Sequence, residues 1–167
     1  AWTEESGWRG VRLAGVAFAS PDDGWAVGNG DTILRWGSGS WRVFGTTSDA
    51  GVGMASVVMA AADDGWLVGT GGLMMRWSAQ GWATVTKPRA RGLRALEMVS
   101  ADDGWAVGEY GLIRRWDGTA WMAYSSPTGT TLTSVAMASP VHGWAVGEGA
   151  ILHWDGAGWR DLDSPAR

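Results

Sequence analysis

The sequence predicts an all-β protein, a β-propeller built of four tandem four-stranded antiparallel blades of about 40 residues each, whose ring is closed by one chain or completed by oligomerisation. Three observations support this fold: a tryptophan motif recurs at a near-constant spacing, apolar residues within each repeat follow strand periodicity, and turn residues bound every short apolar run. Such repeats are typical of propeller blades, whose small sheets pack face to face around a ring. A β-solenoid is the main alternative, although its repeat is usually shorter per coil.

Tryptophan marks the repeats. The string DGWAVG, or a near copy, occurs four times, and its tryptophans lie 41, 39 and 39 residues apart at Trp25, Trp66, Trp105 and Trp144. A second tryptophan follows about eleven residues later, at Trp36, Trp77, Trp116 and Trp154. A third follows five residues after that, at Trp41, Trp82, Trp121 and Trp159. Trp2 and Trp8 match the end of a truncated fifth repeat, so we expect residues 1–12 to be a partial repeat that supplies only an outer strand.

Each full repeat contains four short strands. In the last repeat these are residues 135–139, 143–147, 150–154 and 159–162, all rich in β-branched, aliphatic or tryptophan residues. The first strand is apolar on both faces, as expected near the ring axis, and the fourth is the most polar, as expected at an outer edge. The boundaries that we expect are 13–45 for blade 1, 46–86 for blade 2, 87–125 for blade 3 and 126–167 for blade 4.

Aspartate and glycine are predicted to close the first hairpin of each of the first three repeats, because both tolerate the backbone conformations of tight turns. We interpret these residues as structural rather than as calcium ligands, because each site offers two carboxylates and the fourth repeat offers none. The predicted turn residues are Asp22, Asp23, Gly24, Asp63, Asp64, Gly65, Asp102, Asp103 and Gly104.

Composition excludes several classes of function. The chain has no cysteine, which excludes disulfides and thiolate chemistry, and its net charge of −4 argues against nucleic-acid binding. It has no run of 18 apolar residues, so no transmembrane segment is expected. The chain begins at Ala1 without a signal-like stretch, which indicates a removed leader or a piece of a longer chain. We expect an extracellular or cell-envelope location, and no cofactor or metal.

The repeat string S-x-D-D-G-W-A-V-G-x-x-G-x-I-L-R-W-D-G-x-x-W resembles propellers related to the photosystem II stability/assembly factor, and it is similar to the Asp-box repeats of sialidases. Ser20, Asp22, Gly24 and Trp25 match this element, and residues 100–105 match it again. The second repeat has Ala61 in place of the serine, and the fourth has valine and histidine in place of the aspartates. The resemblance implies a propeller fold with a binding role, and arginine-mediated docking of a partner.

Two groups of residues are candidates for binding a protein or a glycan. The tryptophans that begin the fourth strands are expected to be exposed at an edge, where indole faces suit sugar stacking. A basic cluster in the connection between repeats two and three suits docking of an anionic partner. Arginines beside the second tryptophans are instead expected to stack on neighbouring indoles or to be solvated. The candidates are Trp8, Trp41, Trp82, Trp121, Trp159, Lys87, Arg89, Arg91 and Arg94.

The sequence therefore predicts a non-catalytic binding or scaffold module. The alternative is a structural subunit that self-assembles into a ring or filament, because five copies of the fourth strand accompany four copies of the others and a spare edge strand pairs readily. A glycosidase-like enzyme is the weaker alternative: Glu109 and Glu148 occupy equivalent positions, but nothing indicates a second acid beside either of them.

Overall fold

A computed structural model describes residues 10–45, 52–86 and 91–162 of the chain. These residues form four antiparallel sheets of four strands each, and each sheet is built from one repeat. The predicted β-propeller architecture of four tandem blades is confirmed. Among the described residues, no helix has the length and the apolar character needed to cross a membrane.

The blades are named here by their strands. Blade 1 comprises β1 (Leu13–Ser20), β2 (Asp23–Gly28), β3 (Ile33–Gly37) and β4 (Ser40–Gly45). Blade 2 comprises β5 (Met54–Ala61), β6 (Asp64–Gly69), the 3₁₀ turn η1 (Thr70–Gly72), β7 (Met74–Ser78) and β8 (Gly81–Thr86). Blade 3 comprises β9 (Leu93–Ser100), β10 (Asp103–Gly108), η2 (Glu109–Gly111), β11 (Ile113–Trp116) and β12 (Trp121–Tyr124). Blade 4 comprises β13 (Leu132–Ser139), β14 (His142–Gly147), β15 (Ala150–Trp154) and β16 (Trp159–Asp161).

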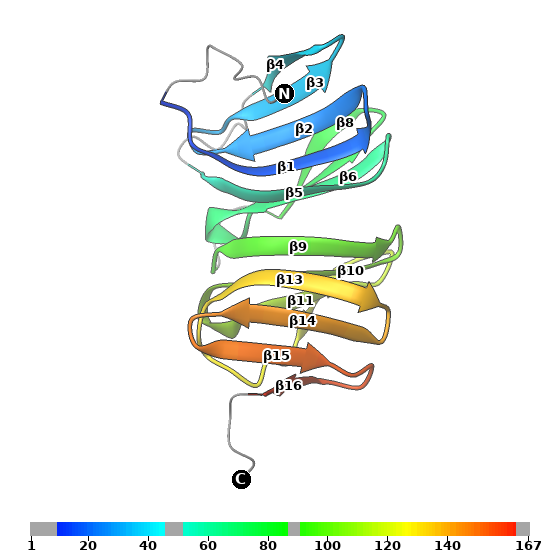
Figure 1. The fold of residues 1–167 in the computed structure, drawn as a ribbon. Helices are drawn as coiled ribbons and strands as arrows, with labels where there is room; N and C mark the ends of the chain where they lie inside the picture. The colour runs from blue at the N-terminus through cyan, green and yellow to red at the C-terminus, as the bar shows by residue number, and fades with distance from the viewer. Residues whose placement is uncertain (1–9, 46–51, 87–90, 163–167) are drawn as a thin grey trace, which may run out of the picture.

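Strands follow chain order within every blade, so the first strand lies at one edge and the fourth at the other. The first strands β1, β5, β9 and β13 lie next to one another along the molecule (Figure 1). Blade 1 and blade 4 occupy its opposite ends. The first strands are therefore inner strands and the fourth strands are outer edges, as their apolar and polar compositions predicted.

The first hairpins of blades 1, 2 and 3 turn two residues earlier than the Asp-Gly pairs that the sequence predicted. Ser20 pairs with Asp23, so Pro21 and Asp22 form the turn, while Asp23 and Gly24 already belong to β2. The Ser20 hydroxyl accepts a hydrogen bond from the Asp22 amide at 3.4 Å. The same offset places Asp64-Gly65 and Asp103-Gly104 inside β6 and β10, whereas Asp63 and Asp102 lie in the turns.

Glycine follows the second aspartate for a packing reason. A Cβ atom on Gly24 would lie 2.6 Å from the Phe18 ring, which covers this glycine from the neighbouring strand. Methionine side chains cover the equivalent glycines of the other three blades in the same way. Close approach of a neighbouring side chain, and not a left-handed turn conformation, therefore favours glycine here.

Each blade supplies its own fourth strand, so the four described sheets are complete without the strand expected after Trp8. Trp8 itself lies outside the described residues. None of these sheets lacks a strand that a second copy would have to supply, so self-assembly by strand exchange gains no support from them.

The hydrophobic core lies between the blades. Three clusters of buried residues each combine one face of a blade with the facing side of the next blade. At the first junction, for example, Trp25 and Val27 of blade 1 pack with Val57 and Leu67 of blade 2. A blade is thus one layer of the core, and its two faces form two separate junctions.

Glycine at the end of each second strand allows close backbone contact. A Cβ atom on Gly108 would collide with the Gly92 carbonyl oxygen, which also accepts a hydrogen bond from the Glu109 amide at 3.0 Å. The corresponding glycines of the other blades meet the carbonyls of residues 12, 53 and 131. Since both partners are backbone, neither can rotate away.

We expect Gly108→Ala to lower the free energy of unfolding by about 1–3 kcal/mol, as overpacking does. Gly158→Ala is the matched control, because a Cβ atom there meets nothing within 4 Å. Chemical denaturation followed by tryptophan fluorescence measures both. Equal effects of the two substitutions would contradict the close-contact explanation.

Candidate functional site

Three tryptophans meet at every described junction between blades, and we call each group a tryptophan triad. Trp25 of blade 1 contacts Trp77 and Trp82 of blade 2, with ring centroids 4.5 and 5.4 Å apart. The same arrangement recurs with Trp66, Trp116 and Trp121, and with Trp105, Trp154 and Trp159. The first tryptophan of each triad is fully buried. Tilted and edge-to-face contacts of this kind stabilise a junction beyond simple area burial.

An arginine and an aspartate clamp each triad. The Arg76 guanidinium lies 5.3 Å from the Trp66 ring and 5.5 Å from the Trp116 ring, so it bridges two blades. Asp64 accepts hydrogen bonds from Arg76 Nε at 2.9 Å and from Nη2 at 3.3 Å, which fixes the guanidinium plane. Arg35 with Asp23 and Arg115 with Asp103 repeat this arrangement, which confirms arginine stacking on indoles. The Asp103 carboxylate also raises the pKa of Arg115.

We expect Arg76→Ala to lower the free energy of unfolding by about 1–2 kcal/mol, because it removes a cation–π contact and a bidentate hydrogen bond. Thermal and chemical unfolding measure the change. Arg42→Ala is the control, because Arg42 is an exposed arginine of the outer strand β4. An equal loss in both variants would show that the clamp contributes nothing specific.

The structure places the outer-strand tryptophans differently from the prediction. Trp121 and Trp159 are buried and Trp82 is half-buried, because their indoles complete the triads. Trp41 is half-buried and packs against Trp36 at 5.6 Å on blade 1, and Trp8 is not among the described residues. The exposed stacking platforms predicted at the outer edges are therefore not found at Trp82, Trp121 or Trp159.

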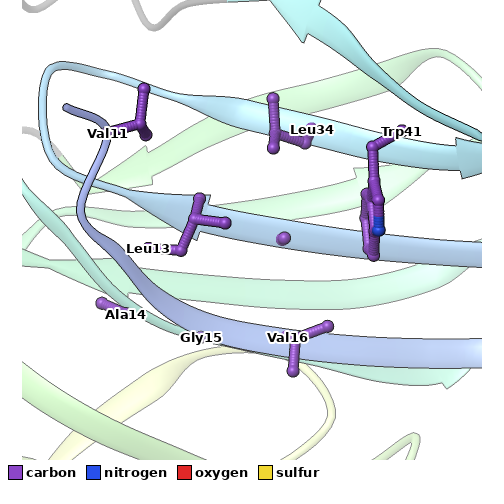
Figure 2. Close-up of a pocket in the computed structure, with 8 residues that line it drawn as sticks. Val11, Leu13, Ala14, Gly15, Val16, Leu34 and Trp41 are labelled. Atoms are coloured by element: carbon purple, nitrogen blue, oxygen red, sulfur yellow. The ribbon is translucent and has the colours of Figure 1, made fainter. Parts of the chain in front are cut away.

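An apolar groove of about 560 Å³ lies on the face of blade 1 that turns away from blade 2 (Figure 2). Its walls include Leu13 and Val16 from β1, Leu34 from β3 and Trp41 from β4. Leu13 and Val16 are exposed to solvent. At the other end of the molecule, Trp144 of blade 4 is exposed as well, although it occupies the position of the fully buried triad tryptophans.

Tyr110 is the centre of a second surface, on blade 3. It is exposed, and its φ of 55° lies in the left-handed region that non-glycine residues rarely adopt. Glycine occupies the equivalent turn position in the other three blades, at Gly30, Gly71 and Gly149. The Arg91 guanidinium lies 5.3 Å from the Tyr110 ring, and its Nη1 donates to the Tyr110 carbonyl at 3.3 Å.

Glu109 connects this tyrosine to a second arginine. Its carboxylate accepts a hydrogen bond from the Gly92 amide at 2.8 Å and another from Arg94 Nη2 at 2.7 Å. The Gly92 amide, with help from Arg94, holds the pKa of this carboxyl below its ordinary value. We call Arg91, Arg94, Glu109 and Tyr110 the tyrosine patch. The candidate residues Lys87 and Arg89 immediately precede it in sequence but lie outside the described residues.

We expect Tyr110→Gly to raise the free energy of unfolding by about 0.5–1 kcal/mol, because a side chain in the left-handed region is strained and glycine is not. Chemical denaturation measures the gain. Tyr124→Phe is the control for loss of a tyrosine in a regular strand of the same blade. A loss of stability in Tyr110→Gly would mean that the Arg91 contact outweighs the backbone strain.

Neither of the two glutamates with a shifted pKa is placed to act as a glycosidase acid. A glycosidase acid needs a raised pKa, whereas Glu109 is held ionised by its partners. Burial does raise the pKa of Glu97, but this residue lies in the inner strand β9 opposite Trp105. Within residues 10–45, 52–86 and 91–162, no group of three or more histidine, aspartate or glutamate side chains is placed to hold a metal ion.

Sequence reasoning missed the end faces and Tyr110. An alignment of the four repeats would have indicated both the end faces and Tyr110, because each involves residues that differ from the repeat pattern. Tyrosine replaces glycine in only the third turn, and His142 and His153 of blade 4 stand where the other blades have the clamp aspartate and arginine. These two imidazoles stack on each other with centroids 5.9 Å apart, and His153 also contacts Trp144.

Comparison with solved structures gives the fold. YCF48 bound to D1 peptide superposes with a TM-score of 0.73 at 19% identity over 92% of this chain and 55% of that one. YCF48 from Cyanidioschyzon merolae gives 0.71 at 17% identity, over 90% and 56% of the two chains. U3-55K gives 0.73 at 13% identity, over 90% and 48%. The chain has the fold of a β-propeller.

This fold agrees with the propeller fold that the sequence resemblance implies. The chain spans about half the length of these propellers. No protein-family model and no curated protein matches the sequence.

Proposed function

We propose that this chain is a non-catalytic scaffold that binds an extended segment of another protein at the tyrosine patch. The observation that carries the proposal is the exposed side chain of Tyr110 in left-handed backbone. Strained residues of this kind cluster at binding sites, because stability alone would favour glycine. Tyrosine also supplies rigid contact area at a low entropic cost, which suits a recognition surface.

The charges around Tyr110 favour an acidic segment. Arg91 and Arg94 are both exposed, and only the carboxylate of Glu109 opposes them within the patch. Arginine recognises carboxylates through planar, paired hydrogen bonds. Lys87 and Arg89, predicted as part of the same basic cluster, add two positive charges to this segment of the chain. A partner carrying Asp, Glu or a terminal carboxylate therefore fits best.

The fold supports protein binding rather than glycan binding. One of the similar propellers is recorded with a bound peptide. A lectin would need accessible indole faces, and three of the predicted sugar-stacking tryptophans are committed to triads. An extracellular or cell-envelope location stays a prediction, and so does the lack of catalytic activity.

Selection of random peptides displayed on phage against the purified chain tests this proposal. We expect enrichment of acidic peptides, with binding at least about tenfold weaker in Arg91→Ala and in Tyr110→Gly. Synthetic copies of the selected peptides, followed by fluorescence anisotropy, measure these affinities. Arg160→Ala is the matched control, because Arg160 is an exposed arginine on blade 4 that pairs with Asp155. Selection of basic or apolar peptides, or equal binding by Arg91→Ala, would refute the proposal.

Self-assembly is the second candidate function. The end faces of the molecule favour it, rather than a spare strand.

A further inference from the structure

Each end of the molecule exposes apolar side chains whose counterparts in other blades are buried, although Ala26 and Leu34 in the groove on blade 1 are themselves buried. Val16 on β1 is 62% exposed, whereas its counterparts Val57, Leu96 and Val135 are 4%, 3% and 6% exposed at the junctions. The difference arises because a preceding blade covers blades 2, 3 and 4, while none covers blade 1 among the described residues. Leu13 and Phe18 are exposed beside Val16 for the same reason.

Blade 4 exposes the opposite face. Trp144 is 41% exposed, whereas its counterparts Trp25, Trp66 and Trp105 are 0% exposed. Val146 and Ile151 are also exposed, although Val107 and Ile113 occupy the same positions on blade 3 and are buried. Blade 4 thus presents the half of a junction that contributes the first tryptophan of a triad.

The two faces are complementary halves of one junction. Blade 1 holds Trp36 and Trp41 in mutual contact at 5.6 Å, which matches the 5.7 Å between Trp77 and Trp82 at a complete junction. Trp36 Nε1 donates to the Pro21 carbonyl at 3.2 Å, as Trp77 Nε1 donates to Ala62 at 3.0 Å. The second and third tryptophans of a triad are therefore already positioned beside the groove.

We propose that a second copy of this chain covers these faces, with blade 4 of each copy seated on blade 1 of the other. Trp144 would complete a triad with Trp36 and Trp41 of the partner copy, and its contact surface would include the groove walls at Val16. Two such junctions, related by a two-fold axis, join two sets of four blades into one ring of eight. Unlike the peptide site proposed above, this surface does not involve the tyrosine patch.

The junction between copies lacks the clamp of the internal junctions. His142 and His153 replace the aspartate and arginine that hold the other triads. We therefore expect association that reverses on dilution. The double variant His142→Asp/His153→Arg restores the clamp and should tighten association about tenfold, since a cation–π contact with its ion pair contributes roughly that factor.

Light scattering on a sizing column across a dilution series tests the proposal. We expect a species of twice the 17.6 kDa chain mass that dissociates on dilution. Val16→Lys and Trp144→Glu should each give a single-chain species, because either substitution places a charge inside the junction. Met122→Lys is the matched control, because this methionine is equally exposed on the outer strand of blade 3 and should leave the mass unchanged.

Mixing the two variants separates a lost interface from a lost fold. Val16→Lys retains an intact blade 4 face, and Trp144→Glu retains an intact blade 1 face. An equimolar mixture should therefore regain a two-chain species, held by one intact junction, that neither variant forms alone. Three results would overturn the proposal: a single-chain wild type at every concentration, unchanged masses in both variants, or a mixture that stays single-chain. Species that keep growing with concentration would overturn the closed ring.

Discussion

The packing of one indole between two blades is the interaction on which this structure depends. A single four-stranded sheet has two apolar faces and no core of its own, so it is stable only when both faces are covered. The triads provide this cover and also set the spacing, because each buried first tryptophan fits between two tryptophans of the next blade. The guanidinium clamp contacts tryptophans of both blades and is held by its paired hydrogen bonds to the aspartate.

The same requirement separates structural from functional surfaces. Residues that repeat in every blade, such as the tryptophans and the aspartate–arginine pairs, are committed to junctions. Residues that differ from the repeat pattern are not needed for these junctions and can serve in binding. Tyr110 breaks the pattern at a turn, and His142 and His153 break it at an end face. The tyrosine patch and the two end faces are thus made of different residues.

Sequence periodicity was sufficient to predict the four sheets, the strand order and the stacking of arginine on indole, because each is imposed by a spacing that recurs in the chain. Periodicity was not sufficient to predict which tryptophan side chains are exposed to solvent. Whether Trp121 is buried or Trp144 is open depends on the presence of a neighbouring blade, which no property of the residue itself reveals. The role of Gly24 was missed for a related reason: its requirement comes from Phe18 on the adjacent strand and not from its own turn propensity.

The triads have a consequence for how the molecule opens. Each of them joins only blades that are neighbours in the chain, so the protein behaves as a one-dimensional array whose units are coupled pairwise. Among the four described blades, blades 1 and 4 each have a single coupled neighbour, so we expect local unfolding to start there and the amide protons of β6 and β10 to exchange last. Closing the array into a ring removes those ends. The protection of amide protons from exchange would then be uniform along the blades instead of decreasing toward blades 1 and 4.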